Sequence, residues 1–488
     1  GLPNQQDGPW AGGVAAINVD PTVRRYMDLW PRPNTPYRFL NNMAMAIKPV
    51  PCFGNRSQLC NDNGDGTVTL IAPGSNQIPI NEEFVGGKFD HHFSNERWGF
   101  LSGTYNWADS ERLPSDALKA LGQGTSPGNN AAISTKHTLG VSHTTTFTPT
   151  IVNEFKFGYS WSEISSDIPK PDYDSTSKFD LKDLVFLNSR ELVGEIGAPR
   201  VTGIGFRTDT SRYGQTSYQY KEGLSIARGN HSYRLGAEIR QLRYLQGSCS
   251  RGCNGVFIWN DLRTFLLNQP RQLDTYIPGS DNPTRHLNQS IAGFYFQDNW
   301  QMTPSFNVNL GMRYEFGTVP DEQNDLESAL VHIDDPYVTV TQTVKNDPRF
   351  SRFPSMPGTV DSLFTNPTLK SFSPRIGLAW SPGGSKRFSI RSGFGIFYEV
   401  PNLYNIRNPL QEIPPFAVVG SVLATNAAQA GVTLRMQPGV ANDSAVVGLL
   451  RGSPVIRGFE YDMKNTTIYR WSTTLQQEVM PGFVVSAG

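Results

Sequence analysis

The stretch Phe306-Asn-Val-Asn-Leu-Gly-Met-Arg-Tyr-Glu-Phe-Gly317 decides the fold of this chain. Its even-numbered positions are all apolar, and its odd-numbered positions are polar or glycine. Successive side chains of a β-strand point to opposite faces, so the pattern predicts one apolar and one polar face. At about 3.3 Å per residue, a tilted strand of this length can cross a bilayer. Strands of soluble proteins are usually shorter, at about 5–6 residues.

The same alternation recurs in pairs of segments, each joined by a short turn. The predicted pairs are 83–93 with 97–107, 135–147 with 151–164, 214–227 with 231–245, 287–302 with 306–317, 372–381 with 387–400, and 467–479 with 483 onward. Long connections rich in Pro, Asn, Asp and Gly separate the pairs, and soluble domains rarely tolerate so many of them. Short periplasmic turns that alternate with long extracellular loops are typical of an outer-membrane barrel.

The sequence therefore predicts an all-β, antiparallel transmembrane β-barrel, of which about twelve strands are visible. Tyr and Trp residues lie near many predicted strand ends, where they suit the two membrane interfaces. The alternative is a β-sandwich with these aromatic residues in its core, but the predicted strands are too long for it. Within one long connection, the segment 260–268 begins with Asn-Asp and predicts a short helix packed over the barrel mouth.

Composition limits the other classes of protein. The chain has 488 residues, too many for one ordinary soluble core. Its 43 basic and 43 acidic residues give no excess of positive charge for binding nucleic acid. The mean hydropathy is −0.39, and no apolar run reaches the ~18–20 residues of a transmembrane helix. A barrel remains compatible with this value, because its lumen face and loops are polar.

The two ends predict how the chain is organised. It has no initiator Met and no signal segment at its start, and it stops inside a predicted strand. We therefore expect an interior piece of a longer protein. Within it, we expect residues 1–80 to form an extracellular loop region and residues 81–488 to form the barrel part.

Several segments resemble a known family. The run Phe294-Tyr-Phe-Gln-Asp-Asn-Trp300, followed by Thr303-Pro304 and Leu310-Gly-Met-Arg-Tyr-Glu315, resembles the barrel signature of TonB-dependent outer-membrane receptors. The group that it is most similar to is the Oar-like receptors, which carry a carboxypeptidase-regulatory-like domain. Further segments with this resemblance are 29–34, 89–94, 373–380, 390–399 and 469–476.

The resemblance implies a barrel of about 22 strands that a plug domain occludes. It also implies energised uptake of a substrate through the inner-membrane TonB–ExbB–ExbD complex. The regulatory-like domain, the plug, the TonB-contacting segment and the last barrel strands are expected outside this sequence. The implied location is the outer membrane of a Gram-negative cell.

Charged residues on the polar faces of the strands form the candidate functional cluster. Those expected to face the lumen are Glu154, Lys156, Arg234, Glu238, Arg313, Glu315, Arg375, Arg391 and Glu399. Either they solvate the channel wall and pair with neighbouring strands or the plug, or they contact the substrate. The extracellular loops are more accessible and offer a second place for direct substrate contact. On the opposite face, Phe306, Val308, Leu310 and Met312 are expected to contact lipid.

The four cysteines form two close pairs, Cys52 with Cys60 and Cys249 with Cys253. Local disulfides in an oxidising compartment are expected, although four cysteines allow three pairings. A zinc site built from all four is the alternative. The gap between Cys52 and Cys60 is wider than the roughly two to four residues usual between paired zinc ligands.

Other motifs have simpler explanations than catalysis or metal binding. Asn61-Asp-Asn-Gly-Asp-Gly66 resembles the start of a calcium loop through Asn61, Asn63 and Asp65, but position twelve would be Ala72 rather than the bidentate Glu. We expect an ordinary turn there, with calcium as the alternative and no other cofactor. The G-x-S-x-G match at 124–128 lies in a polar loop. Adjacent His91 and His92 point to opposite faces of a strand and cannot easily share a metal ion.

The leading hypothesis is a transporter rather than an enzyme, because no nucleophile, base and orienting group come together in the sequence. A second hypothesis is a barrel that anchors surface-displayed loops for adhesion. A third is a soluble all-β binding protein. The expected partners are outer-membrane lipid, the TonB complex and a substrate that the sequence does not identify.

Overall fold

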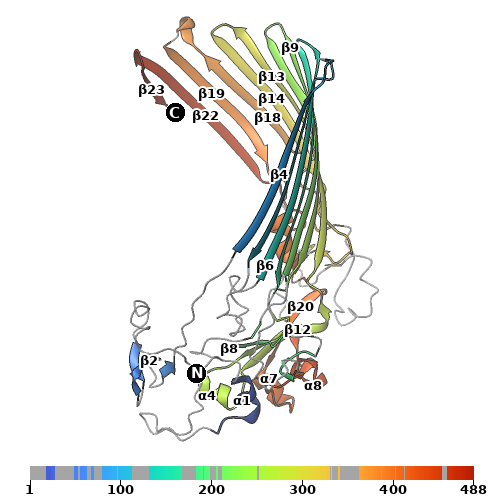
Figure 1. The fold of residues 1–488 in the computed structure, drawn as a ribbon, viewed down its shortest axis with the longest axis vertical. Helices are drawn as coiled ribbons and strands as arrows, with labels where there is room; N and C mark the ends of the chain where they lie inside the picture. Colours follow the sequence, from blue (N-terminus) through green and yellow to red (C-terminus); the bar gives the residue numbers. More distant parts are fainter. Residues whose placement is uncertain are drawn as a thin grey trace.

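The computed structural model describes residues 18–27, 49–52, 55–62, 68–70, 80–95, 97–112, 131–167, 183–188, 190, 192–197, 205–206, 211–249, 252–329, 331, 339–340, 362–385, 387–401, 403–411, 413–452 and 459–488. A 13-stranded, curved sheet dominates the molecule (Figure 1). Each of its strands pairs antiparallel with its neighbours, and the order along the main path follows the chain. The short strand β15 (Asp321–Glu322) joins off this path.

The strands of the main path form all of the predicted hairpins. They are β4 (Ile80–His92), β5 (Phe100–Arg112), β6 (Ala131–Thr148), β7 (Ile151–Asp167), β9 (Ser211–Arg228), β10 (His231–Gly247), β13 (Arg285–Thr303), β14 (Phe306–Gly317), β18 (Phe372–Trp380), β19 (Phe388–Tyr398), β22 (Thr467–Met480) and β23 (Phe483–Ala487). The predicted fold class, an antiparallel barrel wall, is confirmed. Within the described residues β4 and β23 do not pair with each other, so the wall is open.

Short turns close one end of this wall, which we call the turn end; the long connections leave from the other, the loop end. Two of the turns share a sequence pattern, Thr-Pro followed by Thr or Ser. The amide of Thr150 donates to Oγ1 of Thr148 at 3.3 Å, and the amide of Ser305 donates to Oγ1 of Thr303 at 3.3 Å. Another turn uses Gly229 at φ +59°, a left-handed conformation that favours glycine.

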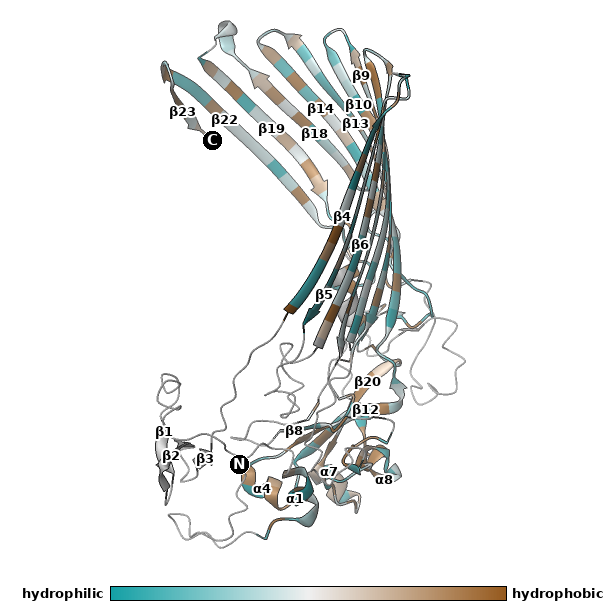
Figure 2. Cartoon of the chain, in the orientation of Figure 1, coloured by the Kyte–Doolittle hydropathy of each residue, from teal (hydrophilic) through white to brown (hydrophobic). Residues whose placement is uncertain are grey.

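The two faces of the wall differ in polarity, as Figure 2 shows in the alternating colours along the strands. On β14, Leu310 is 41% exposed and Met312 is 43% exposed, which is unusual for apolar side chains in water. Val308 is only 8% exposed, because it lies between its cross-strand partners Trp300 and Leu378. We call this side of the wall the outer face and the polar side the inner face.

A second, separate sheet lies beyond the loop end (Figure 1). Its strand order is β21-β20-β12-β11-β8. These strands are β8 (Glu195–Gly197), β11 (Val256–Ile258), β12 (Gln272–Asp281), β20 (Ala417–Leu423) and β21 (Arg451–Gly452). The helices packed with them are α1 (Pro21–Met27), α4 (Leu262–Leu266), α7 (Ala424–Gln429) and α8 (Ser444–Val447). Together they form one unit, which we call the cap.

The cap has its own hydrophobic core, unlike a set of irregular loops. Phe257 is fully buried, with its ring 4.9 Å from Phe186 in an edge-on contact, and Trp259 packs on Phe265 at 5.0 Å. Tyr26 of α1 is also buried, and its hydroxyl donates to the carbonyl oxygen of Leu184 at 2.9 Å. The core therefore joins segments that are far apart in the sequence.

The predicted helix at 260–268 is confirmed in a shorter form, α4. Asp261 caps its start by accepting from the amide of Thr264 at 2.7 Å, while the Thr264 hydroxyl accepts in return from the amide of Asp261. Its apolar residues Phe265 and Leu266 are buried in the cap core.

The remaining elements are small. A three-stranded sheet contains β1 (Pro49–Cys52), β2 (Asn55–Asp62) and β3 (Val68–Leu70), and a ribbon pairs β16 (Ser328–Ala329) with β17 (Thr339–Val340). Helix α6 (Leu403–Gln411) and the 3-10 turns η4 (Pro382–Gly384) and η5 (Val440–Asn442) complete the described elements. No helix among them is long and apolar enough to cross a membrane.

Candidate functional site

The inner face of the wall carries the charged side chains that the sequence selected. Cross-strand partners share a face, so the register determines which side chains meet. Glu238 of β10 lies opposite Gly293 of β13, and Gly293 lies opposite Glu315 of β14. Because Gly293 leaves space between them, charged side chains of β10 and β14 can reach one another across β13.

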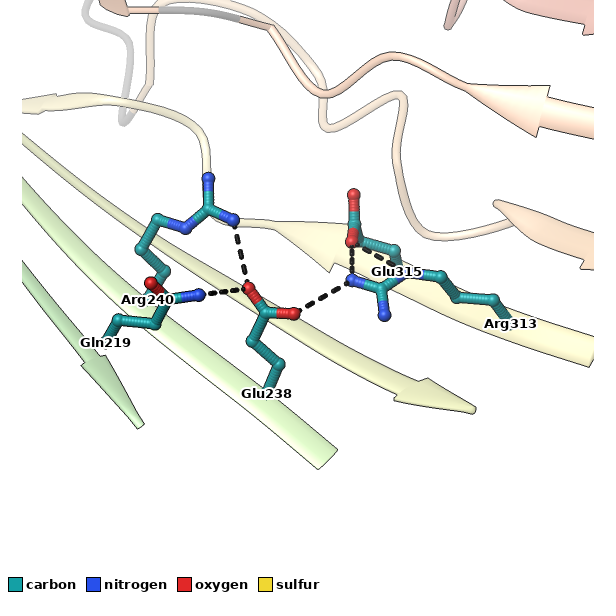
Figure 3. A network of polar contacts seen from close by, with 5 residues as sticks. All are labelled: Gln219, Glu238, Arg240, Arg313 and Glu315. Atoms are coloured by element: carbon teal, nitrogen blue, oxygen red, sulfur yellow. Dashed lines mark hydrogen bonds and ion pairs between the residues drawn. The ribbon is translucent and has the colours of Figure 1, made fainter. Parts of the chain in front are cut away.

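These residues form the most connected ion-pair network of the inner face (Figure 3). Glu238 accepts from Nη2 of Arg240 at 3.0 Å and from Nε2 of Gln219 at 2.8 Å. Its second oxygen lies 3.6 Å from Nη2 of Arg313, which also pairs with Glu315. The side chain of Glu238 is only 14% exposed. One carboxylate therefore ties together guanidinium and amide groups from separate strands.

The other predicted charges are placed less tightly. Lys156 pairs with Glu154 at 2.8 Å, and both side chains are nearly half exposed. Arg234 is exposed on the inner face of β10, and Glu399 follows the end of β19. Arg375 and Arg391 lie on the inner faces of β18 and β19. Arg375 lies opposite Gly311, two residues from Arg313.

At the loop end, apolar side chains of helix α6 pack against the inner face. Helix α6 contributes Leu403, Ile406 and Leu410 to a buried cluster with Leu287, which belongs to the inner face of β13. Nε2 of Gln289, further along β13, donates to the carbonyl oxygen of Pro401 at 3.2 Å. Helix α6 therefore lies against the loop end of the wall.

An acidic turn follows β14 at the same level. Glu322 accepts the amides of His286, Asn324 and Leu326 at 2.8–2.9 Å, and it is 1% exposed. Glu327 accepts the amide of Glu322 at 3.2 Å and is 3% exposed. Burial, with added repulsion from the neighbouring carboxylates, raises the pKa of Glu327 to about 8.

A cavity of about 520 Å³ lies where the cap meets the outer face of the wall. Its polar lining includes Arg190, Arg212, Asp281 and His286. Arg212 is engaged with Glu163 through two hydrogen bonds of 2.6 and 2.9 Å. A disulfide between Cys249 and Cys253, also in the lining, ties the end of β10 to the start of the next cap segment.

The remaining sequence motifs form no site among the described residues. The side chains of Cys52, Cys60 and Asn61 lie outside the described residues, as do Asn63, Asp65 and the stretch 124–128. His91 stacks on Phe89, whereas His92 contacts Phe100 across the strand pair, so the two imidazoles separate. No group of three or more His, Cys, Asp or Glu side chains in the described segments is arranged to hold a metal ion.

The family model for the outer membrane beta barrel domain matches residues 3–488, nearly the whole chain. The chain belongs to this family. It therefore resides in the outer membrane, its outer face contacts lipid, and its inner face lines the barrel lumen. The turn end is then periplasmic and the loop end extracellular.

Solved structures with a similar fold have low sequence identity. The siderophore receptor PirA from Acinetobacter baumannii is 10% identical, with a TM-score of 0.41, over 82% of this chain and 41% of that one. The copper transporter OprC is 9% identical, with a TM-score of 0.42, over 86% of this chain and 46% of its own. The ferric enterobactin receptor PfeA from Pseudomonas aeruginosa, solved as a mutant, is 11% identical, with a TM-score of 0.39, over 84% and 42%.

The chain spans less than half of the length of each of these three proteins. Among curated proteins, no sequence matches it.

Sequence reasoning missed several members of the inner face. Gln219 and Arg240 belong to the Glu238 network, and Arg470 of β22 lies level with Arg375. Each occupies an inward position by the same alternation that identified its neighbours, so a complete reading of the strands could have found it. Except for α4, the cap was missed, because most of its strands are too short to show alternation.

Proposed function

We propose that this chain is the barrel part of an Oar-like, TonB-dependent receptor that takes up a solute across the outer membrane. The observation that carries the proposal is the layout of the lumen face. Its polar, ion-paired wall leads from the periplasmic turns to an extracellular mouth, where α6 packs against β13. A solute would bind at this extracellular mouth and move along the inner face when the occluding parts of the protein rearrange.

Uptake of this kind requires partners beyond the chain. The energy would come from the TonB–ExbB–ExbD complex, through a segment that precedes the barrel in the full protein. The residues of the inner face would solvate and guide the solute, and no bond would be made or broken. Calcium in the loop that contains Asn61 would, if bound, support a surface loop rather than the pathway.

Binding to TonB tests the proposal. The purified full-length protein should bind the periplasmic domain of TonB, and the 488-residue chain alone should not. In the native organism, deletion of this gene and deletion of the tonB gene should abolish uptake of the same solute, and the double deletion should add nothing. Additive defects, or a full-length protein that does not bind TonB, would rule out energised uptake.

A second function is favoured by the cap itself. A unit with a buried core and its own sheet is a suitable surface for binding another cell or macromolecule. In that case the barrel would serve as an anchor for the cap. Replacing the cap segments by short linkers would then abolish adhesion of cells, whereas uptake of solutes would continue.

A further inference from the structure

Three arginines on one side of the lumen have no acidic partner among the described residues. Arg375, Arg391 and Arg470 lie on the inner faces of β18, β19 and β22. Among the described residues, none of them pairs with a carboxylate, in contrast to Arg240 and Arg313 of the Glu238 network. Within the part of the chain that the structure describes, this side of the lumen therefore carries three guanidinium groups that no carboxylate pairs with.

The sheet register fixes the spacing of these arginines. Arg375 and Arg470 both lie opposite Gly395, one on each side, so their backbones are two strand spacings apart, or about 10 Å. Arg391 lies four residues from Gly395 toward the turn end, about 13 Å along the strand. The three side chains thus frame a surface a little more than 10 Å across.

The floor inside this frame is made of glycine. Gly377 and Gly393 are cross-strand partners there. A Cβ added at Gly393 would meet only the carbonyl oxygen of Ile376, at 3.7 Å. One added at Gly377 would meet the Asn309 side chain at 3.5 Å or more and the carbonyl oxygen of Ser392 at 3.9 Å, which are ordinary contacts. Neither glycine has a positive φ angle. Packing and backbone conformation therefore do not require glycine, although glycine weakens a strand.

One of the guanidinium groups is held in place by an aromatic ring. The guanidinium carbon of Arg375 lies 4.6 Å from the ring centre of Phe397, a cation–π contact from the adjacent strand. The Phe397 ring in turn packs over Gly395, where an added Cβ would come within 3.0 Å of it. This arrangement limits the conformations of Arg375 without neutralising its charge.

We propose that this arginine patch, defined by Arg375, Arg391 and Arg470 around Gly377 and Gly393, binds a small solute that carries several carboxylate or phosphate groups. Guanidinium groups match both oxyanions through paired hydrogen bonds. The glycine floor lets the solute lie against the strand backbone. The proposal rests on the proposed uptake function and names the chemical class of its substrate.

Binding of two probes, citrate and tripolyphosphate, tests the patch by calorimetry on the full-length protein in detergent at low salt. The patch variant is Arg375→Gln, Arg391→Gln and Arg470→Gln. The control variant is Lys88→Gln, Lys136→Gln and Lys221→Gln, which removes the same charge from the inner faces of β4, β6 and β9. We expect the patch variant to bind at least one probe about tenfold more weakly, and the control to change affinity by about twofold or less.

A pair of glycine variants tests the floor separately. Gly393→Val should weaken binding about as much while it keeps all three arginines. Gly140→Val is the matched control on β6, where an added Cβ would meet only Oγ1 of Thr104 at 3.9 Å. Heat-dependent migration on gels checks that every variant still forms the barrel.

Several results would overturn the proposal. They are equal weakening by the patch and control variants, no weakening by either, or no binding of either probe by the wild type. A further overturning result is a wild type that binds no probe together with a patch variant that protease cleaves faster than the wild type. The arginines would then bind an acidic segment of the protein itself rather than a solute. TonB binding, measured on the same samples, reports on the uptake function independently of these outcomes.

Discussion

The wall and the cap place the same kinds of side chain in opposite environments. On the wall, Met312 is 43% exposed and Trp471 is 76% exposed. In the cap, Phe257 is fully buried and Trp259 is 2% exposed. The wall keeps its apolar residues outside because lipid covers them, whereas the cap buries them because water surrounds it.

This difference shows that part of the extracellular connections forms a folded unit with a core of its own rather than irregular loops. A barrel strand satisfies its backbone through its two neighbours and needs no core. The cap has strands of two to ten residues and is stabilised by side-chain burial instead. We therefore expect the two regions to respond separately to mutation.

The largest expected effect comes from the cap core. Phe257→Ala should destabilise the cap by about 3–5 kcal/mol, because it leaves a cavity between Phe186 and Trp259. Hydrogen exchange should rise in β11, β12 and β20, while heat-dependent gel migration shows an intact barrel. Phe294→Ala, at a lipid-facing position that is 50% exposed, is the control and should leave exchange in the cap unchanged. Loss of the barrel together with the cap would mean that the two regions form one cooperative unit.

A charge on the lipid face should have the next largest effect. Met312→Arg, near the middle of β14, should cost about 2–4 kcal/mol, because the charge enters hydrocarbon. Gln297→Arg lies level with Gly311 on the inner face and should cost about 1 kcal/mol or less, because the lumen is wet. Reversible urea unfolding of the full-length protein in lipid vesicles measures both. Equal costs for the two variants would contradict the assignment of the faces.

The Glu238 network should contribute less than the lipid face. Glu238→Gln keeps the side-chain shape but removes the charge shared by Arg240 and Arg313, and we expect a cost of about 1–2 kcal/mol. The control is Glu154→Gln, whose pair with Lys156 is nearly half exposed and should be worth about 0.5 kcal/mol or less. The same urea titrations measure the loss of unfolding free energy in both variants. A smaller loss for Glu238→Gln than for Glu154→Gln would show that the residues of the network do not stabilise one another.

The wall was predictable from the sequence because its signal is local. Alternation over ten or more residues, followed by turns such as Thr303-Pro304-Ser305, specified each hairpin and both of its faces. The same alternation placed Glu238 and Arg313 on the inner face. It could not show that Gln219 and Arg240 also meet Glu238, because these contacts depend on the register of β9 against β10 and on the side-chain conformations.

The cap was not predictable because its strands pair with partners that are distant in the sequence. Strand β8 has three residues, and it pairs in parallel with β11, about sixty positions later. Strand β12 pairs with β20, which lies in another long connection. Short apolar runs such as Leu184-Val-Phe-Leu187 were visible in the sequence. However, the sequence does not show which strands these runs pair with, so they could not be distinguished from irregular loops.

The smallest expected effect is at the acidic turn that follows β14, where Glu322 and Glu327 are buried. The pKa of Glu327 is about 8 in the folded turn, against about 4.3 in an unfolded chain. Between these values the folded turn keeps a proton that the unfolded chain has lost. Raising the pH through this window therefore removes stability, and above pH 8 the loss is complete.

We expect the turn to lose about 1 kcal/mol of local stability from pH 6 to pH 7, seen as faster hydrogen exchange at Asn324 and Leu326 after correction for intrinsic rates. Glu327→Gln cannot ionise, so its exchange should not depend on pH in this window. The exposed Glu460→Gln is the control and should retain the wild-type dependence. If the wild type shows no pH dependence, Glu327 is already ionised and the turn is open to water. In solvent exposure, the turn would then resemble the water-exposed loops rather than the buried core of the cap.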